Sequence, residues 1–415
     1  MKPLLSLSKL PQNVSALPGG NGNSDGSFNN VGNNGNWWSA DENNSNNAYN
    51  RNMNYNNENA NWNNNNKTNL FSVRCVQDCN GEAGKPASPL ILELHKAYMD
   101  ARKHKRNTIN QLRFERNLEA ELLSLCNELE TRTYELRPGI CFINELPVKR
   151  EIIAADFRDR VVHHLIYNRI YPILDKKFIY DSYSCRVGKG TLFGIKRVQG
   201  FLLSDAWVLR LDIQGFFMAI NRDILFNLLA GALRTMSPLT EFLIRQIVFN
   251  DPLKDAFFKS PKSAWRDLPP DKSLMNSAPN CGLPIGNLTS QVFANVYLNP
   301  LDNFVKRKLK IKHYGRYVDD MVLVHNDKQI LLNAIFRIRE FMSSELNLIL
   351  HPKKIRLQPA VKGFAFLGAY IYPNGIAIGR RVAKNFRKCV FNPFPNDDKQ
   401  AQRVQSYLGL LGKSC

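Results

Sequence analysis

Two adjacent carboxylates, Asp319 and Asp320, are the side chains of this sequence best suited to chemistry. They stand in His-Tyr-Gly-Arg-Tyr-Val-Asp-Asp-Met-Val-Leu-Val, between apolar stretches typical of short strands, so a tight turn can present both acids at a sheet edge. Neighbouring carboxylates repel each other, and a bound cation removes that cost. Because no Cys or His stands beside them, these oxygen ligands favour Mg²⁺ or Mn²⁺ over zinc. For an isolated Asp-Asp pair, a solvated turn is the alternative.

A third carboxylate, Asp212, follows the apolar run Trp207–Leu211. Nucleotidyl transfer with two metal ions needs such an acid from a second strand, so that ions about 3.5–4 Å apart can hold the attacking and leaving oxygens. The alternative is a helix N-cap, because the run that starts at Ile220 favours a helix.

Six blocks of the sequence resemble those of the reverse transcriptases, in the family's order, between about residues 136 and 372. The blocks are 156–164, 182–190, 209–217, 282–291, 348–354 and 364–370. The family's order of a single acid, a long gap and paired acids is that of Asp212, Asp319 and Asp320. The resemblance therefore implies that these three residues are catalytic and bind two Mg²⁺ or Mn²⁺ ions.

The resemblance also implies contacts to substrate. Phe217 falls where the family places an aromatic ring under the incoming sugar, which implies a preference for dNTPs over rNTPs. Cations at the triphosphate would offset its charge. The expected substrate-binding residues, besides Phe217, are Lys149, Arg150, Arg186, Ile285, Gly286, Gln291 and Lys354. For Lys354, an ordinary surface role is an open alternative.

Residues 285–291, Ile-Gly-Asn-Leu-Thr-Ser-Gln, indicate a subfamily. Most relatives carry Gln-Gly-x-x-x-Ser-Pro, and the variant here resembles the reverse transcriptases of diversity-generating retroelements, which copy a template RNA with frequent errors at adenines. An alkyl group at Ile285 replaces an amide that could hydrogen-bond near the nascent base pair, so discrimination is expected to weaken. A retron or group II intron type enzyme, or a catalytically inactive RNA-binding remnant, is the alternative.

The first 80 residues are rich in asparagine, with 23 Asn among the 49 residues from Asn21 to Asn69. So few aliphatic side chains predict a disordered segment. The interleaved aromatics, such as Trp37 and Trp38, resemble the variable segment of the target proteins of these retroelements, which implies a translated template repeat. A plain low-complexity linker is the alternative.

The implied fold is α+β, a right-hand polymerase with fingers, a palm of antiparallel sheet with helices, and a short helical thumb. The expected segments are a helical extension at 81–135, fingers at 136–204, a palm at 205–372 with a polar insertion at about 253–277, and a hairpin with partial thumb at 373–415. Relatives continue for several helical turns beyond the last residue here, so we expect a truncated thumb with a weaker grip on the duplex.

Charge is unevenly placed. Residues 1–80 carry equal numbers of acidic and basic side chains, so the whole formal net charge of +20 lies in the rest. A basic surface of this size attracts phosphate backbones. The implied partners are template RNA, nascent cDNA, dNTPs and a small basic helical accessory protein.

Other features of the sequence bound the function more loosely. Eight scattered Cys predict free thiols. Adjacent His163 and His164 cannot chelate one ion from a helix, so we interpret them as structural.

No apolar run reaches the ~20 residues of a membrane span, and the apolar run at the N-terminus is too short and interrupted for a signal peptide. A cytoplasmic protein without membrane contact is the expectation.

Overall fold

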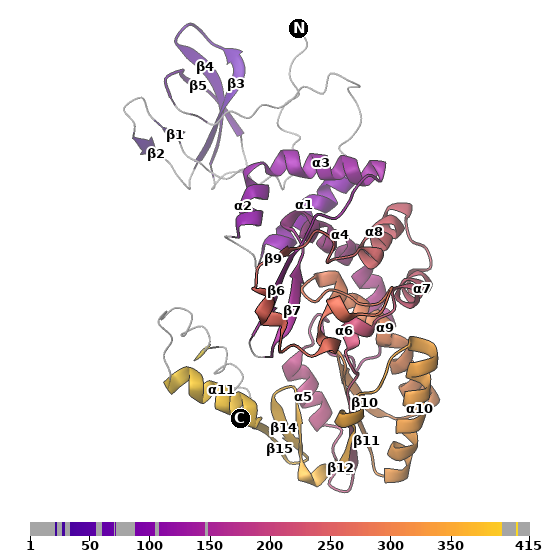
Figure 1. The fold of residues 1–415 in the computed structure, drawn as a ribbon. Coiled ribbons are helices and arrows are strands. Elements are labelled where there is room, and N and C mark those ends of the chain that lie inside the picture. The colour runs from indigo at the N-terminus through magenta and orange to yellow at the C-terminus, as the bar shows by residue number, and fades with distance from the viewer. Residues whose placement is uncertain are drawn as a thin grey trace. The chain divides into compact units, whose positions relative to one another are not determined.

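A computed structural model describes residues 21–22, 27–29, 34–54, 60–69, 71, 88–103, 108–145, 148–391 and 404–405. The chain divides into two units, Met1–Pro86 and Ala87–Cys415. The sequence predicted this boundary after residue 80, and it falls after Pro86 instead. Helices and strands are mixed in the second unit (Figure 1), as the expected α+β class requires.

The described part of the first unit is built from strands. β3 (Asn34–Glu42), β4 (Asn47–Asn54) and β5 (Ala60–Asn66) form an antiparallel sheet, and β1 (Asn21–Gly22) pairs with β2 (Phe28–Asn29). Asn65 Nδ2 donates to Asn50 Oδ1 across the sheet at 2.8 Å, and the Arg51 guanidinium lies 4.0 Å from the Trp62 ring centre. The disorder expected for residues 1–80 is therefore wrong for these strands, because amide and aromatic cross-strand pairs supply contacts that aliphatic side chains do not.

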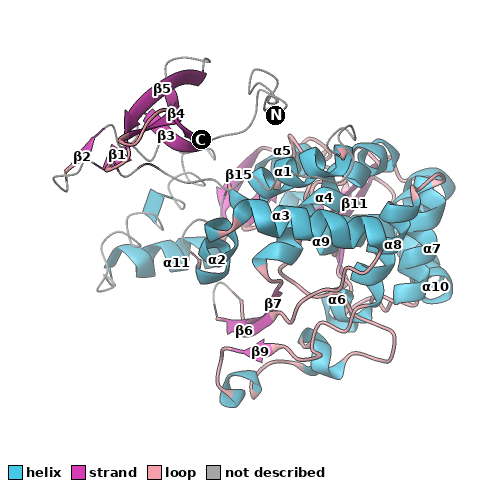
Figure 2. Ribbon diagram, turned by 90° about the horizontal axis from the view of Figure 1, so that it is seen from above, coloured by secondary structure: helices cyan, strands magenta, loops and turns pink. Residues whose placement is uncertain are grey.

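Helices make up most of the second unit. Their bounds are α1 (Pro89–Arg102), α2 (Ile109–Arg116), α3 (Leu118–Thr131), α4 (Phe157–Leu174), α5 (Thr191–Gln199), α6 (Phe216–Ala219), α7 (Arg222–Leu233), α8 (Pro238–Phe249), α9 (Leu288–Asn303), α10 (Lys328–Leu346) and α11 (Arg380–Phe391). Side-chain oxygens cap several N-termini, as Asp156 does for α4 and Asp327 for α10. α4 contacts both α1 and α9 (Figure 2). Their apolar faces form one buried core with the sheet described next.

A four-stranded antiparallel sheet carries the acids. Its strands are β8 (Trp207–Leu211), β10 (His313–Tyr317), β11 (Asp320–His325) and β12 (Arg356–Pro359), in the order β10-β11-β8-β12. Leu209 and Leu323 are fully buried on one face against α10, while Val208 and Val322 are buried on the other. A sheet buried on both faces is rigid, which suits it to fix side chains at its edge.

The expected insertion at 253–277 belongs to a second sheet. β6 (Ile140–Asn144) pairs antiparallel with β7 (Arg150–Ala154), and β9 (Phe257–Phe258) of the insertion pairs parallel with β6. Glu151, 1% exposed, accepts hydrogen bonds from Trp265 Nε1, Ser273 Oγ and the Leu274 amide at 2.7, 2.7 and 2.8 Å. The insertion is therefore an integral part of this sheet.

The C-terminal segment forms a third sheet and a helix. β13 (Phe364–Phe366), β14 (Ala369–Tyr372) and β15 (Gly375–Ile378) are antiparallel, and the β14–β15 hairpin turns at Pro373-Asn374. The hairpin expected at 371–378 is confirmed, with its turn one residue earlier than predicted. α11 begins at Arg380, and apart from 404–405 the part of the expected partial thumb after residue 391 lies outside the described residues. Within the described ranges, no helix combines the length and apolarity that a membrane span requires.

Candidate active site

The turn between β10 and β11 presents the paired acids. The strands pair in register from His313 with Val324 to Tyr317 with Asp320, leaving Val318 and Asp319 as the two-residue loop. Val318 has a φ of 54°, in the left-handed region that β-branched residues rarely adopt. This tight, strained turn directs Asp319 and Asp320 toward one end of the sheet, as the sequence predicted.

Asp212 reaches the same edge from the neighbouring strand. β8 pairs antiparallel with β11, and its last paired residue, Leu211, lies opposite Met321. The next residues in this register are Asp212 and Asp320, so both leave their strands at one edge. The backbone of Asp212 is fixed on its other side, because its carbonyl accepts a 2.9 Å hydrogen bond from the His351 amide.

The electrostatics of the three carboxylates agree with this closeness. Burial raises the pKa of Asp319, and the charge of Asp212 raises it further. Burial also raises the pKa of Asp320 to about 6, with added effects from Asp319 and then from Asp212. Two groups that repel and resist ionisation form a site where a positive charge is favourable.

Protein cations partly balance these acids in the structure. Lys354 Nζ donates to both carboxylate oxygens of Asp212, at 2.9 and 3.0 Å, and Arg210 Nη2 lies 3.9 Å from Asp320 Oδ1. Across the ranges that the structure describes, no three acidic, His or Cys side chains gather closely enough to hold a metal ion as they stand. In this arrangement Lys354 occupies both carboxylate oxygens of Asp212. The donor set of hard carboxylate oxygens still fits divalent cations.

Phe217 lies in α6, five residues after Asp212 in the sequence. The chain enters α6 through Gly215, which has a φ of 53°, and a Cβ there would lie 2.8 Å from the Asp271 carbonyl oxygen. Phe217 is partly buried and contacts the same apolar cluster as Ile285. The structure thus brings together two of the expected substrate contacts.

The insertion brings a cation that sequence reasoning missed. Lys272, in a short 3-10 helix at Pro270–Lys272 beside α6, lowers the pKa of Asp319 by its charge. In the sequence, Lys272 looked like any residue of a polar loop. The glycine at position 215, against which Asp271 of the insertion packs, was the available signal.

The loop before α9 positions Ile285 and Gly286 against β7. Ile285 accepts a 2.9 Å backbone hydrogen bond from Ile153, and Gly286 has a φ of 134°. A Cβ on Gly286 would lie 2.9 Å from the Ile153 carbonyl oxygen, so only glycine fits. Gln291, exposed on α9, accepts a hydrogen bond from Cys185 Sγ at 3.1 Å.

The three cations expected at the triphosphate have different surroundings. Lys149 and Arg150 lie at the start of β7, where Lys149 makes only long contacts, 3.9 Å each, to Glu145 and Asp267. Arg186 is 7% exposed and donates to the Asp175 carboxylate at 2.6 Å and to backbone carbonyls. In this structure its guanidinium is held by the fold, and its triphosphate role stays a prediction.

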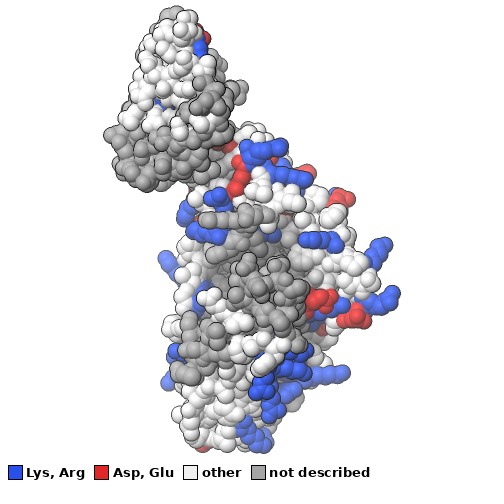
Figure 3. Space-filling view, turned by 90° about the vertical axis from the view of Figure 1, so that its left-hand side faces the viewer, with Lys and Arg blue, Asp and Glu red and all other residues white. Residues whose placement is uncertain are grey.

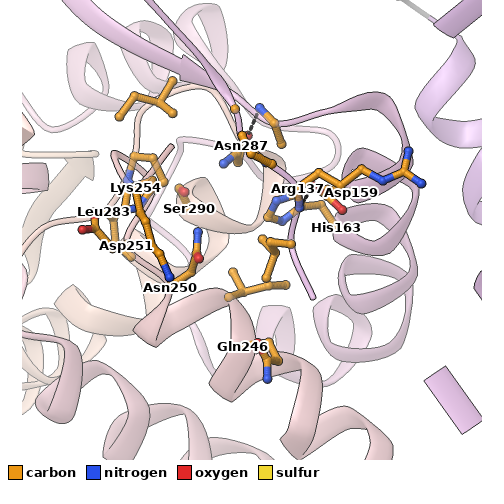
Figure 4. Close-up of a pocket in the computed structure, with 18 of the residues that line it drawn as sticks. Arg137, Asp159, His163, Gln246, Asn250, Asp251, Lys254, Leu283, Asn287 and Ser290 are labelled. Carbon is orange, nitrogen blue, oxygen red and sulfur yellow. Dashed lines mark hydrogen bonds between the residues drawn. The ribbon is translucent and has the colours of Figure 1, made fainter. Parts of the chain in front are cut away.

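A pocket of about 430 Å³ adjoins the same loop, between the end of β7, α4 and α8 (Figure 4). Asn287 and Ser290 line it together with Asp159 and His163 of α4. Asp159 accepts a 2.7 Å hydrogen bond from the Tyr134 hydroxyl, and burial raises its pKa to about 6. His163 Nδ1 lies 2.8 Å from the Thr289 hydroxyl, and burial lowers its pKa to about 3. His163 therefore links α4 with α9 as a neutral ring, in agreement with its structural interpretation.

Basic side chains lie on the surface of the second unit. Figure 3 shows Lys and Arg gathered on the lower part of one face, with few Asp or Glu among them. The exposed cations of α11 are Arg380, Arg381, Lys384, Arg387 and Lys388. This surface has the charge that a nucleic-acid backbone requires.

Acids that meet at one end of an antiparallel sheet, beside a glycine-containing loop and basic surfaces, are features of nucleotidyl-transferring proteins. The family described as "Reverse transcriptase (RNA-dependent DNA polymerase)" matches residues 148–371. The match covers more than half of the chain, so the protein belongs to this family.

Similarity to individual proteins is more distant. The COX1/OXI3 intron 1 protein of Saccharomyces cerevisiae is 21% identical over 198 residues, which are 47% of this chain and 21% of the yeast protein. Among solved structures, apo telomerase of Candida tropicalis matches with a TM-score of 0.41 at 11% identity, over 61% of this chain and 53% of that one. Telomerase of Candida albicans matches with a TM-score of 0.39 at 11% identity, over 66% and 53%. The chain thus spans about a fifth of the yeast relative and about half of each telomerase.

Proposed function

We propose that this protein is an RNA-directed DNA polymerase with a right-hand architecture, which copies a template RNA into cDNA from dNTPs. The single observation that carries the proposal is the placement of three carboxylates at one sheet edge. Asp212 directly follows β8, Asp319 lies in the turn between β10 and β11, and Asp320 is the first residue of β11. The charge of Asp212 raises the pKa of both partners, so the three acids act on one another.

In this proposal, Asp212, Asp319 and Asp320 hold two Mg²⁺ or Mn²⁺ ions. Such ions, when bound, lower the pKa of the primer 3′-hydroxyl and neutralise the departing pyrophosphate. Lys354 releases Asp212 when substrate arrives and turns its ammonium to the triphosphate. Phe217, at the start of α6, lies under the sugar and excludes a 2′-hydroxyl. Lys149, whose ion pairs to Glu145 and Asp267 are each 3.9 Å long, approaches the phosphates from the other sheet together with Arg150.

The four-stranded sheet corresponds in this proposal to a palm, and the β6–β7 sheet with α4 and α5 to fingers. The insertion joins the fingers through β9 and reaches the acids through Lys272. The template strand runs past Asn287 and Ser290, which line the pocket beside the loop.

The finer assignment is a diversity-generating retroelement enzyme that makes errors at adenines. It is supported by Ile285 and Gln291, which replace the usual Gln and Pro, and by the Asn-rich first unit. An intron-encoded reverse transcriptase is the second candidate, favoured by the resemblance to the yeast intron protein. A small basic helical protein is the accessory partner that the first assignment implies.

Primer extension on an RNA template with Mg²⁺ and dNTPs tests the activity. We expect DNA synthesis by the full chain and none by Asp319→Asn. The affinity of this variant for the primer–template should stay nearly unchanged or rise, because the substitution removes one negative charge from a basic surface. A chain that binds the template with the same affinity and adds no dNTP would instead be an inactive remnant.

A further inference from the structure

Arg316 is a fully buried cation three residues before Asp319, the first of the paired acids. Its side chain is 0% exposed, and it donates to both oxygens of Asp302, from Nε at 2.8 Å and from Nη2 at 2.7 Å. The remaining nitrogen, Nη1, donates to the carbonyl of Val318 at 2.9 Å and to Asn295 Oδ1 at 3.3 Å. One side chain thus connects a buried carboxylate with the turn that carries Asp319.

The hydrogen bond to the Val318 carbonyl acts on the conformation of the acid turn. This carbonyl belongs to the peptide unit that joins Val318 to Asp319, so its direction sets the direction of Asp319. Val318 has a φ of 54°, and a β-branched residue keeps such a conformation only when its surroundings impose it. The hydrogen bond from Arg316 supplies that constraint.

The partners of the Arg316 guanidinium on α9 are themselves held in place. Asp302 is 0% exposed on α9 and accepts a further hydrogen bond from the Tyr314 hydroxyl at 2.7 Å. Asn295, about two turns earlier on the same face of α9, donates to the Ser184 carbonyl at 2.9 Å. Arg316 itself is tied through its backbone amide to the Asp181 carbonyl at 2.9 Å. The turn is therefore anchored to α9 and to the segment before α5.

We propose that Arg316 is a positioning residue that pins the Val318 carbonyl, keeps the acid turn in its left-handed form, and so preorganises Asp319 and Asp320 for divalent cations. The inference rests on the proposed function of these acids. An exposed ion pair could not do this, because solvent would compete for the guanidinium. A lysine could not replace Arg316, because only the guanidinium fork reaches the carboxylate and the carbonyl together.

The test must separate positioning from stability. Arg316→Met alone leaves Asp302 buried without its cation and can fail to fold. The triple variant Arg316→Met, Asp302→Leu, Tyr314→Phe replaces the whole buried polar group with apolar side chains of similar volume, a change that proteins often tolerate. The matched control is Tyr314→Phe, which removes a hydrogen bond to the same Asp302 oxygen and leaves the bond to the turn intact.

Mn²⁺ affinity, measured by calorimetric titration of the full chain, is the main readout, and circular dichroism monitors folding. We expect the triple variant to bind Mn²⁺ about tenfold more weakly than the control, because the turn is no longer held by a hydrogen bond to the Val318 carbonyl. Adding Val318→Gly should restore most of that affinity, because glycine occupies the left-handed region without strain.

Two outcomes would overturn the inference: a folded triple variant that binds Mn²⁺ as tightly as the control, or wild-type protein without affinity for Mn²⁺. A wild-type chain that binds Mn²⁺ but extends no primer would count against the proposed activity alone. Primer–template affinity should be the same in all variants, since Arg316 is buried away from solvent.

Discussion

Lys354 Nζ and the Asp212 carboxylate form a two-pronged contact, at 2.9 and 3.0 Å, across 142 residues of sequence. The 3-10 turn Pro352–Lys354 delivers the lysine to the end of β8. A cation of the protein thus occupies the oxygens that the proposed metal ions would need. Lys354 would then compete with metal for Asp212, besides being a candidate contact for substrate.

The Lys354→Met variant should separate these two roles. Without the competing ammonium, Mn²⁺ should bind more tightly in the absence of substrate. The rate of dNTP addition should fall at least about tenfold, because one cation at the developing phosphate charge is lost. The control is Lys353→Met, which removes an exposed neighbouring lysine and should change neither quantity. A variant with unchanged Mn²⁺ affinity and an unchanged rate would leave Lys354 an ordinary surface residue.

Neutralising Asp320 should stabilise the metal-free protein at neutral pH. Its pKa is raised to about 6, above the ~3.9 of an unfolded Asp, so the stability it contributes is present below pH ~4 and is lost as the pH rises through about 6. In EDTA, Asp320→Asn should therefore show a higher unfolding midpoint than wild type at pH 7.5, with the gap closing toward pH 4.5. Exposed Asp205→Asn serves as the control. An equal gap at both pH values would refute the assigned pKa shift.

Lys272 is expected to assist catalysis from the insertion. Its charge acts on Asp319, and the 3-10 helix that carries it contacts α6. Lys272→Met should lower the rate of dNTP addition about tenfold without changing the unfolding midpoint, since a partly exposed cation adds little to stability. Lys262→Met, an exposed lysine of the same insertion, should leave the rate unchanged. Equal effects of the two variants would show only a general loss of charge.

Ile285 is expected to influence fidelity. Its backbone is held by β7, and its side chain contacts the same apolar cluster as Phe217. Ile285→Gln restores an amide near the nascent base pair and should reduce misincorporation opposite template adenines. Ile285→Leu keeps the alkyl character and should retain the error rate. Sequencing of cDNA made on one adenine-rich template measures both, and an unchanged adenine error rate in Ile285→Gln would reject the link.

Part of this site could be predicted from the sequence. Alternation of apolar runs with acids located the turn at Asp319 and the strand end at Asp212, because side-chain periodicity reports burial directly. The hairpin at 371–378 followed from its turn residues. These features depend on a few neighbouring residues, which is why local patterns suffice.

The remainder depends on contacts between distant residues. Arg186 was expected to contact substrate, and nothing in the sequence indicated that Asp175 and backbone carbonyls hold it. The insertion looked polar and detached, yet buried Glu151 ties it to β7. The strands of the Asn-rich unit are held by cross-strand amide and aromatic pairs, which amino-acid composition does not reveal. Arg316 gave no local signal, because its partner Asp302 lies on another element.

Diffraction from crystals of the chain with primer–template, an incoming dNTP and Mn²⁺ tests the central claim most directly. Anomalous scattering locates manganese without reference to the model of the protein. We predict two peaks about 3.5–4 Å apart, coordinated by Asp212, Asp319 and Asp320, with Lys354 moved away from Asp212. A well-occupied substrate complex without manganese at these acids, or with Lys354 still bound to both oxygens of Asp212, would contradict the account.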